Sequence, residues 1–294
     1  MPIIPVMKFG GTTLQGAFDK ESPEYAELME LSRKEGDLER LYQAAAQRRI
    51  EVRAQRLKDV AQQFIIPHVR EGRIPVVVTS AFGWATDKWK FLAEALSDKP
   101  DPREYARLQM AGELRSNSAL ALALRAMGYK AKSLTGREAG VRTTPQFVDA
   151  HVAEDLELRN INLMVAEGVI PVVAGFQGFF TDPTTQRNEV SILARGGSNL
   201  TAVALAWALD QRECCMYSDV DGLYDRPPEE PGAVLLAEAW AEDVLEMRPY
   251  PQVIQKEALR FALEKGVDIW IKNGAVAGRA GTRIICRRKG CLFA

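Results

Sequence analysis

Short apolar runs rich in β-branched residues alternate along this chain with segments of helical periodicity. The runs lie at 3–9, 74–81, 129–134, 169–176, 214–220, 267–271 and 282–287. Several of them are apolar at both odd and even positions, as expected of strands that are covered on two faces. The helical segments include 103–126, 151–167, 198–210 and 253–266. The alternation predicts an α/β protein with a mostly parallel central sheet sandwiched between helices.

Three glycines stand at or near the ends of predicted helices. Gly168 directly follows the segment 151–167, Gly128 lies two residues after 103–126, and Gly266 is the last residue of 253–266. A residue in the left-handed conformation often ends a helix, and glycine adopts that conformation at the lowest cost. We therefore expect all three to be carboxy-terminal caps.

Two stretches interrupt the alternation. The segment 15–62 is charge-rich with apolar residues at helical spacing, which predicts two or three exposed helices. A dimer contact, a lid and a solvated helical hairpin all remain open as its role. The second interruption is "FFTDPTTQRNEVSILARGG", where we place a boundary near 182–188. This predicts an amino-terminal lobe, 1–185, and a carboxy-terminal lobe, 186–294.

Composition limits the classes of partner. With 294 residues, 47% of them hydrophobic, the chain can bury a large core. Its 38 basic and 39 acidic residues nearly cancel, so no global field attracts nucleic acid or an anionic membrane. The sequence has no signal-like amino terminus and no apolar stretch near the roughly 20 residues of a membrane span. We expect a cytoplasmic protein that binds any anionic ligand at a local site.

The cysteines and histidines exclude several kinds of site. The four cysteines form no CxxC pair, so we expect reduced thiols and no metal cluster. The only histidines are His68 and His151, and neither has a neighbour at metal-ligand spacing. Ser-His-Asp hydrolases and histidine-ligated zinc enzymes are therefore not predicted.

The first candidate site is "PVMKFGG", residues 5–11. Gly10 and Gly11 directly follow a predicted strand, where the missing Cβ atoms would let the backbone approach an anionic ligand. Lys8 adds a mobile positive charge at the same place. The order of residues differs from the GxxxxGK[ST] loop, because the lysine precedes the glycines. A phosphate-handling loop and a simple turn with a surface lysine both fit this stretch alone.

The second candidate site is "ARGGSN", residues 194–199, directly before an apolar helix. The first turn of a helix carries unpaired N–H groups and a partial positive charge, which favour anions. Ser198 is a suitable N-cap, and the Arg195 guanidinium fits a carboxylate or a phosphate. An ordinary capped helix explains neither the double glycine nor the arginine.

The third candidate site is "YSDVDGLYD", residues 217–225. Its acidic residues come at the carboxyl end of a predicted strand, where parallel sheets bind ligands. Asp219 and Asp221 could contact a ribose or, through water, a magnesium ion. A plain Asp-Gly turn is the alternative.

Together these motifs resemble one known family. "KFGGTT", "VVVTSAFGWATD", "MAGELRSN", "LTGREAGVRTT", "GFQGFFTD", "ARGGSNLTAVALAWAL", "YSDVDGLYD" and "GTRI" follow the order of the corresponding motifs in aspartate kinases of the amino acid kinase family. The resemblance covers 3–14 and about 72–286. It implies the two-lobed amino acid kinase fold and the transfer of a phosphoryl group from MgATP to L-aspartate, giving ADP and 4-phospho-L-aspartate. Members of the family commonly form homodimers, which the resemblance implies here as well.

The resemblance also implies a role for each matching residue. The catalytic residues would be Lys8, Gly10, Gly11 and Asn199. The aspartate-binding residues would be Ser80, Thr86, Glu113, Arg195 and Ser198. The nucleotide-binding residues would be Lys8, Gly10, Gly11, Ser218, Asp219, Asp221, Tyr224 and Arg226. Mg²⁺ would accompany ATP, and we assign no residue as a metal ligand.

The chain departs from the family pattern at several places. Asn199 stands where the family has an aspartate that organises the catalytic lysine; it can still accept a hydrogen bond from Lys8 but lacks the charge. Gln252 replaces a nucleotide-contacting lysine, and Gln255 and Lys256 replace His-Pro. Lys256 or Arg226 could supply the missing charge. The chain ends soon after "GTRI", so we expect no ACT regulatory domains.

These departures leave two alternatives to an aspartate kinase. One is a kinase of the same fold that acts on another small amino acid or acid. The other is a weakly active regulatory or binding paralogue, which the changes at Asn199 and Gln252 favour. An α-amino acid as the acceptor is favoured by Ser80, Thr86, Glu113 and Arg195.

Overall fold

The computed structural model describes residues 3–15, 38–83, 85–248, 251 and 253–286, without the side chains of 38–45. The strands of its main sheet are β1 (Val6–Phe9), β2 (Val76–Thr79), β3 (Ala131–Leu134), β4 (Ile170–Ala174), β7 (Glu213–Ser218), β8 (Glu238–Trp240), β9 (Asp268–Asn273) and β10 (Thr282–Ile285). Their order is β3-β4-β2-β1-β7-β9-β10-β8. Neighbours from β3 to β9 are parallel, and β10 runs antiparallel to β9. The predicted, mostly parallel sheet is confirmed.

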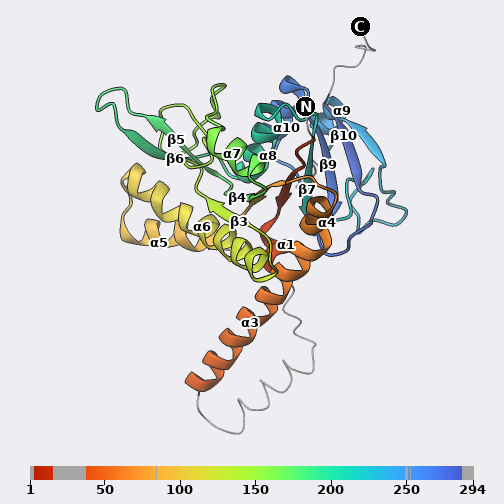
Figure 1. Cartoon of the computed structure of the whole chain (residues 1–294), viewed down its shortest axis with the longest axis horizontal. Coiled ribbons are helices and arrows are strands. Elements are labelled where there is room, and N and C mark those ends of the chain that lie inside the picture. The colour runs from red at the N-terminus through yellow and green to blue at the C-terminus, as the bar shows by residue number, and fades with distance from the viewer. Residues whose placement is uncertain (1–2, 16–37, 84, 249–250, 252, 287–294) are drawn as a thin grey trace.

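Helices cover both faces of this sheet (Figure 1). They are α1 (Gly11–Gln15), α3 (Leu38–Val60), the π-helical η1 (Ala61–Ile65), α4 (Ile66–Arg70), α5 (Ala85–Leu96), α6 (Pro102–Ala126), α7 (Arg159–Ala166), α8 (Gly197–Ala208), α9 (Ala241–Glu246) and α10 (Lys256–Lys265). None of the described helices combines the length and apolar character needed to cross a lipid bilayer. The helix predicted at 151–167 begins only at Arg159. Val152, within its expected first turn, pairs with Thr143 as an isolated β-bridge instead.

Neighbouring residues of the central strands point to opposite cores. Val6, Val76 and Val78 belong to a cluster that includes side chains of α7, α8 and α10. Met7 and Phe9 belong to a second cluster with side chains of α3, η1 and α6. In Figure 1 the first group of helices lies above the second. The strands are apolar at both parities because each parity faces a different layer of helices.

The predicted glycine caps are confirmed. Gly128, Gly168 and Gly266 have φ angles of 88°, 70° and 70°. Gly266 is the C-cap of α10 and donates its backbone N–H to the carbonyl of Ala262. Each glycine occupies the left-handed conformation that an L side chain would strain.

A separate antiparallel hairpin joins the two halves of the chain. Its strands are β5 (Gln177–Thr181) and β6 (Asn188–Ile192), and Gln186 in its turn has a φ of 55°. The predicted boundary at 182–188 falls in this turn. The division into lobes 1–185 and 186–294 stays a prediction.

The predicted helical segment 15–62 is described only from residue 38 onward. There it forms one helix, α3, which projects from the body and continues into η1 and α4 (Figure 1). Leu57 and Val60 near its carboxyl end are buried in the second core cluster. The expectation of exposed helices is therefore wrong for the last turns of α3.

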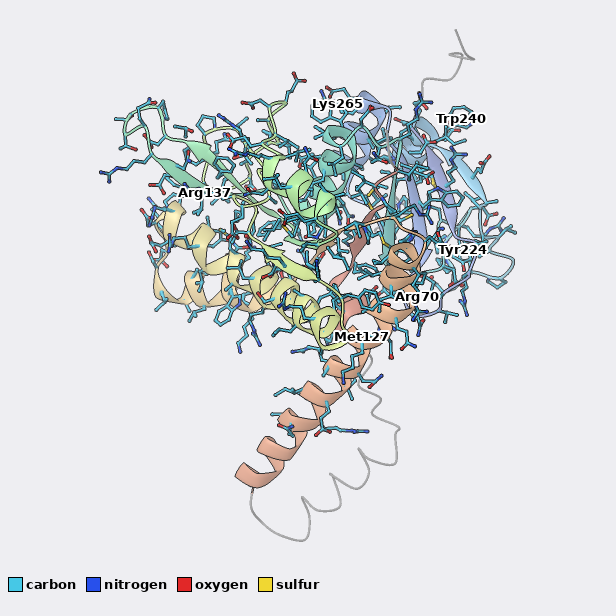
Figure 2. All side chains as sticks on the ribbon, viewed as in Figure 1. Arg70, Met127, Arg137, Tyr224, Trp240 and Lys265 are labelled. Atoms are coloured by element: carbon cyan, nitrogen blue, oxygen red, sulfur yellow. The ribbon has the colours of Figure 1, made fainter. Side chains whose placement is uncertain are left out.

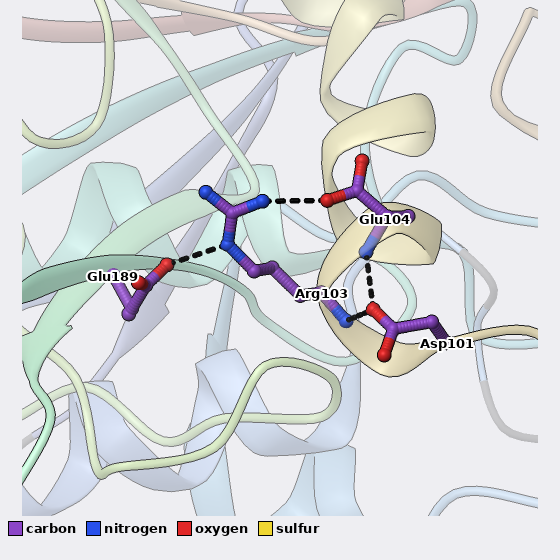
Figure 3. A network of polar contacts seen from close by, with 4 residues as sticks. All are labelled: Asp101, Arg103, Glu104 and Glu189. Atoms are coloured by element: carbon purple, nitrogen blue, oxygen red, sulfur yellow. Dashed lines mark hydrogen bonds and ion pairs between the residues drawn. The ribbon is translucent and has the colours of Figure 1, made fainter. Parts of the chain in front are cut away.

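Helix α6, which carries residues of the site below, has a strong amino-terminal cap (Figure 3). The Asp101 carboxylate accepts the backbone N–H groups of Arg103 and Glu104, both at 3.0 Å, and Arg103 Nε donates to Glu189 of β6 at 2.8 Å. Asp101→Ala is expected to lower the free energy of unfolding by about 1 kcal/mol, because two N–H groups lose their acceptor. Urea denaturation measures the change, and the nearby exposed Asp98→Ala is the control. Equal stability of the two variants would contradict the role of the cap.

Candidate functional site

The candidate site lies where the strand order changes direction. β1 lies between β2 and β7. The next strands along the chain, β2 to β4, lie on one side of β1, and the later strands, β7 to β10, lie on its other side. A crevice at the carboxyl ends of parallel strands is the usual ligand site of such sheets. Here it is a cavity of about 1340 Å³, lined by the loops after β1, β2 and β7 and by the start of α8. Its volume lies above the range of about 300–1,000 Å³ that is typical of small-molecule pockets.

The cavity brings together nearly all of the residues singled out from the sequence. Those that line it are Lys8, Gly10, Gly11, Ser80, Thr86, Glu113, Arg195, Ser198, Asn199, Ser218, Asp219, Tyr224 and Arg226. Asp221 is not among the lining residues. The predicted members therefore converge from five separate segments of the chain.

The loop after β1 is held close to its neighbours. The Gly10 backbone N–H donates to the Tyr217 carbonyl at 3.0 Å, so this amide is not free for a ligand. A Cβ on Gly11 would lie 2.2 Å from the Ala81 carbonyl oxygen, so only glycine fits there. Lys8 is half-buried. Burial lowers the pKa of its ammonium to about 8, although the negative charge of Asp219 opposes the shift. Lys8 thus changes charge near neutral pH.

Glu113 of α6 presents a buried carboxylate to the cavity. Its residue surface is 3% exposed, and Oε1 accepts the Ala81 N–H at 3.2 Å. The other oxygen, Oε2, is buried without a hydrogen-bond partner in the described structure. Burial raises the pKa of Glu113 to about 8. A cationic group of a ligand would supply the missing partner.

The start of α8 differs in detail from the prediction. Gly196, with a φ of 82°, is the N-cap, and Ser198 lies inside the first turn, so the predicted Ser198 cap is wrong. With its N-cap at Gly196, the helix begins at Gly197, two residues before the start that a Ser198 cap would give. The Arg195 side chain is 91% exposed at the cavity and lies 3.7 Å from the Asp87 carboxylate. An exposed guanidinium held by one weak ion pair remains available for an anionic ligand.

Asn199 is paired with Gln255, which the sequence analysis noted only as a departure from the family. Asn199 Nδ2 donates to Gln255 Oε1 at 2.5 Å, and Asn199 is 3% exposed. Its Oδ1 atom has no partner in the described structure, so the expected hydrogen bond from Lys8 is not formed. The Gln255 side chain also covers Gly196, where a Cβ would lie 2.0 Å from Gln255 Cδ. Gln255 therefore determines the orientation of the Asn199 amide.

Some residues of the loop after β7 line the cavity, and another bonds to the rest of the protein. The Ser218 hydroxyl donates to Asp219 at 3.0 Å, and both residues line the cavity, as does Tyr224, which is labelled in Figure 2. Asp221 instead accepts hydrogen bonds from Arg279, at 2.5 Å, and Asn273, at 2.6 Å. The Arg279 hydrogen bond lowers the pKa of Asp221. Asp221 is thus bound to Asn273 and Arg279, and its predicted contact with a nucleotide stays a prediction.

Two further residues of the cavity were missed. Tyr105 and Gln109 of α6 line it together with Glu113. Their spacing of four residues is that of one helix face, so the sequence carried the signal once Glu113 was assigned.

The described cysteines and histidines take no part in the cavity. Cys214, Cys215 and Cys286 are free, and burial raises the pKa of all three thiols. Cys291 lies outside the described residues, as does Gln252. His151 is hydrogen-bonded to Glu257 at 3.0 Å. Among the residues described, no three His, Cys, Asp or Glu side chains gather as a metal site.

The chain belongs to the amino acid kinase family, whose model matches residues 4–273. It is similar to the aspartokinase of Corynebacterium glutamicum, at 40% identity over 66% of this chain and 45% of that protein. It is similar also to the aspartokinase of Helicobacter pylori, at 35% identity over 74% of this chain and 53% of the relative. The chain thus spans about half the length of the curated relatives that it matches.

Solved structures agree on the fold. The aspartate kinase from Synechocystis matches with a TM-score of 0.72 and 29% identity, covering 96% of this chain and 40% of that one. An isopentenyl phosphate kinase matches with a TM-score of 0.56 and 20% identity, over 96% of this chain and all of the other. The expected amino acid kinase fold is confirmed, and the second match shows that this fold also occurs in a kinase of a different acceptor.

Proposed function

We propose that the chain catalyses ATP-dependent phosphorylation of the side-chain carboxylate of L-aspartate. The bond between the γ-phosphorus and the β–γ bridging oxygen of ATP breaks, and a bond from that phosphorus to a carboxylate oxygen forms. The products are ADP and 4-phospho-L-aspartate. The observation that carries the proposal is the meeting in one cavity of Lys8, the buried Glu113 carboxylate and the exposed Arg195 guanidinium. Similarity to aspartokinases over most of the chain supports the choice of acceptor.

Lys8 and the start of α8 serve the transferring phosphoryl group. Phosphoryl transfer needs in-line placement and positive charge around the equatorial oxygens more than covalent participation by the protein. The Lys8 ammonium supplies a mobile charge, and Gly10 and Gly11 line the cavity beside it. The start of α8, where Ser198 lines the cavity, adds the partial positive charge of a helix amino terminus. These groups stabilise the charge that develops in the transition state.

Glu113 and Arg195 distinguish the two ends of an amino acid. The unpartnered oxygen of Glu113 accepts the substrate ammonium, and Arg195 binds the α-carboxylate. Ser80 and Thr86, both half-buried, add hydroxyl groups at the same end of the cavity. This set orients a zwitterion so that its side-chain carboxylate faces Lys8.

The nucleotide would lie along the β7 loop, against Ser218, Asp219, Tyr224 and Arg226. Mg²⁺ is usually held by one or two carboxylates together with substrate phosphates. The exposed Asp219 carboxylate at the cavity fits that requirement, whereas Asp221 is engaged by Arg279. The metal would neutralise phosphate charge, while the chain's own residues bind and orient the two substrates.

The test is ATP-dependent formation of an acyl phosphate, trapped with hydroxylamine, over a panel of amino acids and other small acids. Aspartate is expected to give the hydroxamate at the highest rate. A higher rate with another acid would replace the proposed acceptor. Nucleotide binding without any hydroxamate would indicate a binding paralogue.

Asn199, which is paired with Gln255, supplies no carboxylate beside Lys8. We therefore expect a lower turnover than in a kinase that has a carboxylate at position 199. Asn199→Asp is expected to raise kcat for aspartate about tenfold, because a carboxylate facing the cavity stabilises the charged form of Lys8. The gain is expected to be larger above pH 8, where the wild-type Lys8 loses its proton. Steady-state kinetics at pH 7 and pH 9 measure both effects. A variant no faster than wild type at either pH would contradict this explanation, and Asn199→Ser controls for loss of the amide.

Three expectations accompany the proposal: a homodimer, a cytoplasmic location and a nucleotide-binding carboxy-terminal lobe. The family resemblance supports the first. The second rests on the sequence patterns described above, and the third on the family resemblance. Sedimentation analysis of the purified chain tests the dimer.

A further inference from the structure

Arg56 of α3 binds two backbone carbonyl groups at the edge of the site. Its Nε donates to the Thr13 carbonyl in α1 at 2.8 Å, and its second guanidinium nitrogen donates to the Gly274 carbonyl after β9. What we call the Lys8–Gly11 loop consists of the end of β1, Gly10 and the first residue of α1. Arg56, 43 residues after Thr13, thus connects α1 to the segment after β9.

The two carbonyl-bearing segments are packed directly against each other. A Cβ on Gly274 would lie 2.4 Å from Thr13 Cγ2, so the segments approach without space for a side chain. The Gly274 N–H donates to the Ser218 carbonyl at 2.6 Å, and the Gly10 N–H donates to the Tyr217 carbonyl at 3.0 Å. Arg56 therefore binds the junction of the loops after β1, β7 and β9.

The rest of α3 keeps Arg56 in place. One turn earlier, the Arg53 guanidinium lies 4.5 Å from the centre of the Phe82 ring, in the loop after β2. Leu57, next to Arg56, is buried beside Phe9 and Tyr217, whose rings stack at 4.8 Å. The carboxyl-terminal part of α3 is thus packed against the segments that follow β1 and β2.

Arginine suits this position for two physical reasons. α1 has only five residues, so its last carbonyl groups have no intrahelical partners, and a cation near them is favourable. The planar guanidinium can also donate to two acceptors in fixed directions, which a lysine ammonium on a flexible stem does poorly. A structural residue anywhere in the fold could satisfy one carbonyl; this one satisfies two that belong to separate segments of the chain, α1 and the end of β9.

We propose that Arg56 is a positioning residue that fixes the Lys8–Gly11 loop against the strand ends on the nucleotide side. Through this contact the phosphates of a bound nucleotide and Lys8 keep one relative position. The kinetic part of the inference rests on the proposed kinase function; the part about nucleotide binding does not.

The test compares Arg56→Lys and Arg56→Ala with Arg48→Ala. Arg48 lies on the same helix in an exposed ion pair with Glu51 and is the matched control. Binding of MgADP, the KM values of both substrates, kcat and the melting temperature are measured well below the lowest melting temperature. Both Arg56 variants are expected to bind MgADP at least tenfold more weakly and to lose at least tenfold in kcat, with the KM for aspartate within threefold. The control is expected to match wild type.

A purely structural role would show a different pattern. It would lower the melting temperature while leaving nucleotide affinity and kcat of the folded protein near wild type, and that result would overturn the proposal. Restoration of MgADP binding in Arg56→Ala by added guanidinium ion would support it. If Arg56→Ala does not fold, the affinity of Arg56→Lys decides. If wild-type protein phosphorylates no acid, the proposed function fails, while the MgADP comparison still tests Arg56.

Discussion

Lys8→Ala is expected to lower kcat for aspartyl phosphate formation by a hundredfold or more. Removal of one preorganised charge donor from a transition state costs on the order of 3 kcal/mol. In this cavity Lys8 lies beside Gly10 and Gly11, and the family resemblance assigns it to the phosphoryl group. The hydroxamate assay at saturating ATP and aspartate measures the effect. A variant that keeps the wild-type rate would overturn the assignment of Lys8.

The matched control for Lys8 is Lys88→Ala, which removes an exposed lysine from α5. It is expected to leave kcat unchanged. The Lys8 variant is expected to be at least as stable as wild type, because the buried environment disfavours the ammonium and lowers its pKa to about 8. Thermal denaturation at pH 7 thus separates a catalytic defect from a folding defect: a large loss of stability in Lys8→Ala would assign the residue a structural role.

The main sheet and most of the site could be predicted because they depend on local patterns. Strands with apolar residues at both odd and even positions predict a layer of helices on each face of the sheet. The carboxyl ends of parallel strands meet at one edge. Ser80 and Asp219 directly follow such strands and Lys8 is the penultimate residue of one, so their convergence follows from the topology. Glu113 needed the family resemblance, because a glutamate on an amphipathic helix shows no sign of being buried.

The misplaced features depend on contacts that no local pattern contains. Asp221 ends outside the cavity because Arg279, 58 residues later in the chain, binds its carboxylate. Asn199 bonds to Gln255 instead of Lys8 because α10 begins directly against the start of α8. Helical periodicity over 151–158 was misleading because Val152 forms a bridge with Thr143. In each case a partner outside the local pattern, 9, 56 or 58 residues away, determined the conformation.

Glu113→Gln is expected to raise the KM for aspartate by a hundredfold or more while changing the KM for ATP little. The amide keeps the shape of the side chain but cannot neutralise the substrate ammonium, and a hydrogen bond to a buried charged group is worth more than a neutral one. In wild type, kcat/KM for aspartate is expected to rise with pH up to about 8, because the charged form of Glu113 binds the substrate and its pKa is raised to that value. The variant is expected to lose this rise.

The same substitution is expected to stabilise the protein in alkaline solution. The folded pKa of Glu113 lies above the ordinary glutamate value of 4.5, so the folded state binds more protons than the unfolded state between pH 4.5 and pH 8. Wild-type stability therefore falls across this window, by up to about 1.4 kcal/mol per pH unit from this group. Glu113→Gln has no such titration, so its stability advantage over wild type is expected to grow from pH 5 to pH 8 and then stay constant.

Urea denaturation at pH 5, 7 and 8.5 measures this difference, and Glu104→Gln, on the exposed face of α6, is the control. A constant difference between variant and wild type over this range would show that Glu113 ionises normally. Proton release gives an independent check. Below pH 8, aspartate binding to wild type must deprotonate Glu113, so the heat of binding is expected to vary with the ionisation enthalpy of the buffer. If the protein keeps the buried Glu113 carboxylate for the substrate ammonium at a cost in stability, the pH-dependent stability difference and the buffer-dependent heat of binding are expected together.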